Sequence, residues 1–79
     1  PDSFEMFLES GEIEITKNPH HISQCGLLHK FFCEWCEENE YEPINARNFN
    51  IAMKCQGVDR QRKSTKGFCW IGVKTRLEL

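Results

Sequence analysis

The fold of this 79-residue chain is decided by residues 45–73, NARNFNIAMKCQGVDRQRKSTKGFCWIGV. Asn45 is placed to cap a helix, because an Asn side chain can accept a hydrogen bond from the first free N–H groups of a helix. We expect this helix to run to Gln56-Gly57, where glycine suits a C-terminal stop. Its apolar residues recur at the spacing of one helical face: Phe49, Ala52 and Met53. The stretch therefore begins with a helix that has one core side and one polar side.

Two strand patterns follow this helix. Residues 58–62 and residues 68–74 read as extended segments, and they are joined by residues 63–67, KSTKG. This connection is rich in residues that favour turns and carries two lysines. The pattern predicts a hairpin with a strongly cationic tip.

Two further helices are predicted before residue 45. Asp2-Ser3 is typical of a helix N-cap, and the helix it begins should end near Ser10-Gly11. Residues 12–16 alternate, which indicates a short strand or an extended connector. The next helix should begin near Ser23, carry apolar residues at 27, 28, 31, 32 and 35, and end at the acidic run 37–40. Pro43 then fixes a turn.

This order of elements is that of a winged helix-turn-helix. The expected class is α+β, with three helices and a C-terminal β-hairpin wing, and the third helix would be the recognition helix. At 79 residues we expect one domain, residues 1–79. No run of apolar residues is long enough for a membrane span, so no membrane partner is expected.

The charges are divided between the two halves of the chain. Residues 1–42 hold ten carboxylates and two lysines, whereas residues 43–79 hold eight Lys or Arg and only Asp59 and Glu78. The net charge of −2 therefore conceals a basic C-terminal half. Such a half is expected where a surface meets phosphate, although segregated charge can also merely solvate two faces of a small domain.

The predicted DNA contacts lie in the third helix and in the wing. A recognition helix needs side chains that reach base edges or phosphates, and a wing supplies positive charges and hydroxyl donors to the backbone. The candidates are Asn45, Arg47, Asn48, Asn50 and Lys54 in the helix and Arg60, Arg62, Lys63, Ser64, Thr65 and Lys66 in the hairpin. We expect duplex or forked DNA as the partner.

No catalytic, metal or cofactor site is predicted. Five cysteines cannot all pair within one chain, and most stand in apolar stretches, which favours packing roles in a reducing compartment. Cys33 and Cys36 have a spacing seen in zinc and redox sites. They lie inside a helical pattern without a second close pair, so both of those readings are weaker. Trp35 and Trp70 are expected in the core, and His20, His21 and His29 have no assigned role.

The order and spacing of these residues resemble a known family. The run from residue 28 to residue 73 resembles the C-terminal winged-helix domain of the D5/P4-type primase-helicases of poxviruses, phages and plasmids. The residues that carry the resemblance are Leu28, Phe32, Trp35-Cys36-Glu37-Glu38-Asn39, Pro43, Asn45-Ala46-Arg47-Asn48-Phe49, Gly57-Val58, Arg62-Lys63, Gly67, Trp70 and Ile71-Gly72-Val73. Residues 4–9 also resemble the helix that enters this domain. The chain departs from the family at His29, where Tyr is common, and at Glu40, where glycine often ends the helix.

The resemblance implies a role in DNA replication. The chain would be a fragment of a longer protein that carries a primase-type module and a hexameric superfamily 3 ATPase. That parent would be an ATP-dependent helicase-primase, located inside the host cytoplasm or a viral replication site. The fragment itself has no Gly-x4-Gly-Lys-Ser/Thr loop and no paired acidic metal site, so it should be catalytically silent. The alternative is a protein-interaction winged helix that docks on the helicase ring or on a polymerase without binding DNA.

Overall fold

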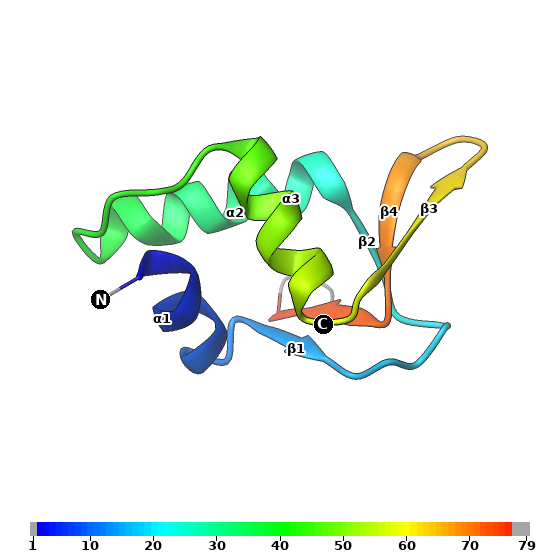
Figure 1. Ribbon diagram of the computed structural model, residues 1–79, viewed down its shortest axis with the longest axis horizontal. Helices are drawn as coiled ribbons and strands as arrows, with labels where there is room; N and C mark the ends of the chain where they lie inside the picture. Colours follow the sequence, from blue (N-terminus) through cyan, green and yellow to red (C-terminus); the bar gives the residue numbers. More distant parts are fainter. Residues whose placement is uncertain (1, 77–79) are drawn as a thin grey trace.

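The computed structural model describes residues 2–76, with three helices and five short strands (Figure 1). The helices are α1 (Ser3–Glu9), α2 (Cys25–Glu38) and α3 (Ala46–Cys55). The strands are β1 (Ile13–Ile15), β2 (Ile22–Gln24), β3 (Asp59–Lys63), β4 (Gly67–Ile71) and β5 (Val73–Thr75). The α+β class and the three predicted helices are confirmed. Pro1 and residues 77–79 of the predicted domain lie outside the described residues.

The strands form two antiparallel sheets. One contains β1 and β5, and the other has the order β2-β4-β3. The sequence predicted one strand over residues 68–74, but Gly72 divides this segment into β4 and β5, which belong to different sheets. Gly72 has φ +88°, a left-handed conformation that glycine adopts without steric cost. The predicted hairpin is present as β3 and β4.

Helix α2 begins at Cys25, close to Ser23, near which its start was predicted. Ser23 itself lies in β2, and its hydroxyl donates to the carbonyl of Val73 at 2.8 Å. The cap is Gln24, whose Oε1 accepts from the backbone N–H of Leu27 at 2.7 Å. Among the two alternatives for residues 12–16, the short strand is correct.

The end of α2 is closed by a left-handed residue that is not glycine. Glu40 has φ +61°, its N–H donates to the carbonyl of Glu37, and the N–H of Tyr41 donates to that of Cys36 at 2.8 Å. These two bonds form a Schellman motif, which satisfies the free carbonyls at a helix end. The Tyr41 ring stacks on Trp35 with the centroids 5.4 Å apart. Glu40 therefore adopts the left-handed conformation that is usually adopted by glycine at this position.

The core lies between the three helices and the inner face of the three-stranded sheet. Phe49 of α3 is fully buried, with ring centroids 5.5 Å from Phe4 and 4.9 Å from Phe32. Trp70 is fully buried and Trp35 is half-buried, so the prediction that both tryptophans pack in the interior is confirmed. His29, which had no assigned role, makes a structural contact. Its Nε2 lies 3.0 Å from the carbonyl of Ile44 and links α2 to the turn before α3.

Candidate nucleic-acid interface

The hairpin tip is a tight turn fixed by glycine. The N–H of Lys66 donates to the carbonyl of Lys63 at 3.2 Å, and Lys63 is paired with Gly67. Gly67 follows the turn with φ +73°. A turn followed by a left-handed glycine is a common three-residue hairpin connection, because it matches the twist of the strands. Ser64, Thr65 and Lys66 are consequently held out in solvent.

One face of the hairpin carries both arginines and both aromatic residues. In the ladder Arg60 is opposite Trp70, and Arg62 is opposite Phe68. Directly opposed residues of an antiparallel pair point to the same face, and so do residues two positions apart. Trp70 anchors this face in the core that also holds α3. Arg60, Arg62 and Phe68 therefore extend the core-facing side of the sheet outwards toward the tip.

Arg60 is held over the aromatic residues of this face. Its guanidinium carbon lies 4.4 Å from the centroid of the Phe68 ring and 5.9 Å from that of Trp70. Both distances are within the range of cation–π attraction, which favours one position for an otherwise flexible side chain. The sequence predicted Arg60 only as a positive charge of the wing, whereas in the structure its guanidinium has a preferred position over the two rings.

The other basic residues of the hairpin make no ion pair with described residues. Within residues 2–76, the single ion pair joins Arg76 to Glu12 at 3.4 Å. Arg62 and Lys66 are exposed, and Lys63 is half-buried. These three charges are therefore available to an anionic partner.

The predicted contact residues of α3 differ in their availability. Arg47, Asn48 and Lys54 are exposed on its outer side, as predicted, whereas Asn50 is half-buried. Asn45 is exposed, but its Oδ1 is occupied as the helix cap, because it accepts from the N–H of Asn48 at 2.8 Å. Its side chain is therefore held at the helix start, and its amide N–H groups are free to donate to a partner.

The acidic part of the chain lies away from the hairpin. In Figure 1 the hairpin of β3 and β4 forms the right-hand end of the molecule, and the turn that follows α2 forms the left-hand end. The glutamates of residues 37–42 lie in the last turn of α2 and in the turn that follows it. The longest dimension is 35 Å, so the acidic cluster does not cover the cationic tip. The first turn of α3 and the hairpin tip face the same long edge, uppermost in Figure 1, with the start of α2 between them.

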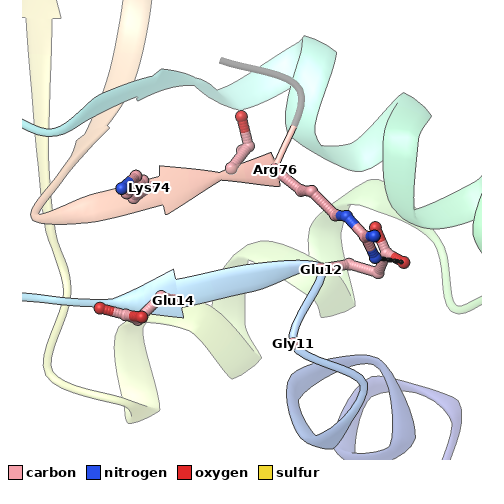
Figure 2. A pocket seen from close by; sticks show the side chains of 6 residues that line it. Gly11, Glu12, Glu14, Lys74 and Arg76 are labelled. Carbon is pink, nitrogen blue, oxygen red and sulfur yellow. Dashed lines mark hydrogen bonds and ion pairs between the residues drawn. The ribbon is translucent and has the colours of Figure 1, made fainter. Parts of the chain in front are cut away.

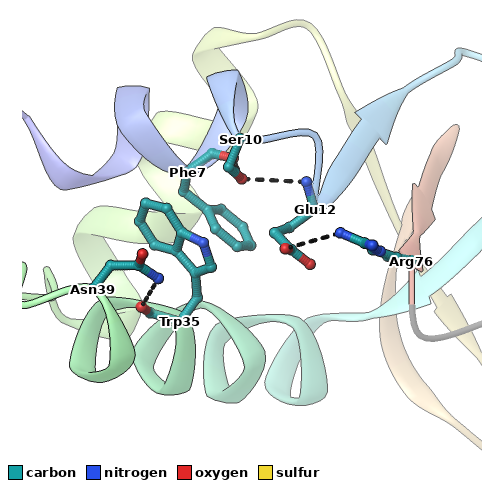
Figure 3. A network of polar contacts seen from close by, with 6 residues as sticks. All are labelled: Phe7, Ser10, Glu12, Trp35, Asn39 and Arg76. Carbon is teal, nitrogen blue, oxygen red and sulfur yellow. Dashed lines mark hydrogen bonds and ion pairs between the residues drawn. The ribbon is translucent and has the colours of Figure 1, made fainter.

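A hollow over β1 and β5 is charged but balanced. It has a volume of about 260 Å³, and its lining includes two carboxylates and two basic residues (Figure 2). Glu14 is in register with Lys74 across the two strands, and Arg76 reaches Glu12. Figure 3 shows how Glu12 is fixed, with its N–H donating to the hydroxyl of Ser10 at 3.2 Å. Because its charges neutralise one another, this hollow is a poor site for a polyanion.

A groove also runs between the hairpin tip and the start of α2. It has a volume of about 450 Å³ and is lined by Ile22, Gln24, Leu27, Thr65 and Lys66. Leu27 is 66% exposed there, and Ile51 is 51% exposed on the outer side of α3. Together with Phe68 of β4, they are the large apolar residues that the described part of the chain exposes.

The described residues show no cluster of metal ligands. Among residues 2–76, no three His, Cys, Asp or Glu side chains converge as ligands, and no helix has the length and apolar character of a membrane span. Cys33 Sγ lies 3.6 Å from His29 Nε2, but burial raises the pKa of the Cys33 thiol, which disfavours the thiolate needed for nucleophilic chemistry.

Phe68 is a candidate surface residue that was not predicted. It was read only as part of a strand, yet it is 47% exposed and stands under Arg60. The sequence signal for its position is the two-residue alternation within each strand. Once the hairpin register is known, this alternation places residues 60, 62, 68 and 70 on one face.

Comparisons of the chain with protein-family models, curated proteins and solved structures found no match.

Proposed function

We propose that this chain is a DNA-binding winged helix-turn-helix domain, with α3 as its recognition helix and the hairpin of β3 and β4 as its wing. In this proposal Arg47, Asn48 and Lys54 meet the major groove, and the charges of the hairpin follow the adjacent phosphate backbone. The succession of α2, a connecting turn and α3, followed directly by a hairpin, supports the proposal.

The observation that carries the proposal is the unpaired positive charge of the hairpin. Arg62, Lys63 and Lys66 have no carboxylate partner among residues 2–76, and the glutamates after α2 lie at the far end of the molecule. A small domain with balanced surface charge would place some of these carboxylates beside the lysines. Separation of this kind suits contact with phosphate.

The setting of the proposed activity is DNA replication. The resemblance to the C-terminal domain of primase-helicases supports a role as the DNA-binding part of a viral or mobile-element replication enzyme. The domain would hold DNA while the ATPase and primase parts of a longer chain perform the chemistry. Joining several such domains in a hexamer would raise the effective concentration of each site and compensate for weak individual binding.

The test is a titration of the 79-residue chain with fluorescently labelled duplex, forked and single-stranded DNA at two salt concentrations. We expect a dissociation constant on the order of micromolar for duplex DNA. If about four to six phosphates are contacted, the logarithm of the association constant should fall with the logarithm of salt at a slope near −4 to −5. Binding that does not respond to salt would contradict the proposal.

A second candidate function is a protein-interaction module. The exposed side chains of Leu27 and Ile51 favour it, because large apolar residues on a surface often mark contacts with another protein. The same titration separates the two functions. A pure interaction module would bind none of the three DNA substrates at either salt concentration.

A further inference from the structure

Phe68 is an aromatic residue whose position the core does not explain. Its side chain is 47% exposed, in contrast to Trp70 on the same face, which is fully buried. The core could end at Trp70. Phe68 lies two positions closer to the hairpin tip, and the hairpin forms one end of the molecule (Figure 1). Because the ring is exposed, its apolar surface stays hydrated and contributes little buried area to the interior.

The ring is nevertheless held in place. It belongs to β4, the central strand of the sheet, and the Arg60 guanidinium lies 4.4 Å from its centroid. An aromatic ring has two faces, and one arginine covers only one of them. The remaining exposed surface is a flat apolar area of fixed orientation.

Positive charges lie beside this flat area. Arg62 is directly opposite Phe68 in the ladder and points to the same face, and Lys66 lies in the adjoining turn, whereas Lys63 points to the other face of the strand. An aromatic face beside several cations is the combination that single-stranded nucleic acid needs, because its bases offer free faces and its phosphates offer charge. A base inside a duplex has both faces covered by its neighbours, so Phe68 has no stacking partner there.

We propose that Phe68, supported by Arg60, stacks on an unpaired nucleobase, and that the domain therefore prefers a junction between duplex and single-stranded DNA to continuous duplex. This inference rests on the proposed DNA binding and names its substrate. Arg62 and Lys66 hold the phosphates on either side of the unpaired base. The helix α3 remains on the duplex arm of the junction.

The experiment compares two DNA molecules of the same length and charge at one salt concentration. One is a continuous duplex, and the other is a fork of two strands of the same lengths that are non-complementary over one half, so that unpaired arms begin in the middle. Affinity is measured for the unaltered chain and for Phe68→Leu, Phe68→Trp and Leu27→Ala. The leucine keeps an apolar side chain in the strand but removes the flat ring, and the tryptophan enlarges the ring. Leu27→Ala removes an exposed apolar side chain of α2 that is not part of the Phe68–Arg60 contact.

We expect the unaltered chain to bind the junction more tightly than the duplex. Phe68→Leu should weaken junction binding by roughly 5- to 50-fold, since loss of one base–aromatic stack has an effect of this order. It should change duplex binding by less than about twofold. Phe68→Trp should retain the preference, and Leu27→Ala should leave both affinities unchanged.

A direct readout does not depend on any variant. A 5-iododeoxyuridine placed at the first unpaired position should crosslink, on irradiation, to the peptide that contains Phe68, and the same base within the duplex should not. Crosslinking elsewhere, or equal affinity for the two DNA molecules, would overturn the inference and leave the proposed DNA binding intact. An equal loss on both substrates in Phe68→Leu would also overturn it. Failure to bind either DNA would overturn both proposals.

Discussion

Lys17 and Gly72 meet backbone to backbone, although they are 55 positions apart in the chain. The N–H of Lys17 donates to the carbonyl of Gly72 at 3.0 Å, and the N–H of Thr16 donates to the same oxygen at 2.8 Å. A Cβ atom on Gly72 would lie 2.7 Å from the Cα of Lys17. This contact joins the end of β1 to the point where the chain passes from one sheet to the other.

The first prediction concerns this contact. Gly72→Ala combines a left-handed φ of +88° with a backbone clash, and neither partner is a flexible side chain that could move away. We expect a loss of about 3 kcal/mol in the free energy of unfolding. For a domain of this size the melting temperature should fall by about 12–24 °C. Thermal unfolding followed by circular dichroism measures the change.

Gly11→Ala is the matched control for this variant. Gly11 has a similar φ of +82°, but nothing lies within 4 Å of an added Cβ. It should therefore show the backbone cost alone, about 1 kcal/mol. Equal losses in the free energy of unfolding of the two variants would mean that the close approach of Lys17 contributes nothing to the cost of Gly72→Ala.

The second prediction concerns the end of α2. Glu40 adopts φ +61° in the Schellman motif, a conformation that costs a non-glycine residue about 1 kcal/mol. Glu40→Gly should therefore stabilise the domain by about that amount, with a rise of roughly 4–8 °C in the melting temperature. Glu42→Gly removes a neighbouring carboxylate from a position outside the left-handed region and should not stabilise. A gain in both variants would point to relief of charge repulsion instead.

The third prediction concerns pH. Burial raises the pKa of the Cys25, Cys33 and Cys36 thiols above the ordinary value of 9.0. Above pH 9 the unfolded chain releases protons that the folded chain keeps, so the free energy of unfolding decreases as pH rises. Urea unfolding at pH 8, 9 and 10 should show a falling midpoint.

Two cysteine variants test this cause. Cys36→Ala removes a fully buried thiol and should weaken the pH dependence of the unfolding midpoint. The loss of packing should lower the midpoint at every pH without adding to that dependence. Cys55→Ala removes an exposed thiol and should leave the dependence as it was. A midpoint that is constant from pH 8 to pH 10 would contradict the prediction.

The fourth prediction concerns the hairpin charges. The double variant Lys63→Ala, Lys66→Ala should weaken binding to all DNA sequences and flatten the salt dependence by about 2 units of slope, one for each lost phosphate contact. Lys74→Ala removes an exposed lysine that stands opposite Glu14 in the balanced hollow. It should alter neither affinity nor slope. Equal effects of Lys74→Ala and the double variant would show that only total charge matters.

The helices were predictable because their signals are local. Asn45 and Asp2 cap the helices in which they were placed, and the apolar spacing of Phe49 and Met53 identified the buried face of α3. A cap and a period of 3.6 residues need only the neighbouring sequence. The cationic turn of the hairpin was found for the same reason, since lysine, serine, threonine and glycine stand together.

The errors arose where distant partners decide the structure. Strand β2 was not predicted, because its three residues are held extended by pairing with β4. Residues 68–74 read as one strand because nothing local reveals that β5 pairs with β1. The role of Phe68 was missed in the same way, because its exposure depends on where the core ends. Strand pairing between distant segments is not encoded in any single window of sequence.

The opposite positions of the hairpin and the glutamate-rich turn have a consequence for the approach to DNA. A net charge of −2 alone would repel a polyanion. The two oppositely charged ends, however, experience opposite forces in its field, and these produce a torque that turns the molecule until the hairpin leads. Association should therefore slow as salt is added, although the chain and its partner have charges of the same sign.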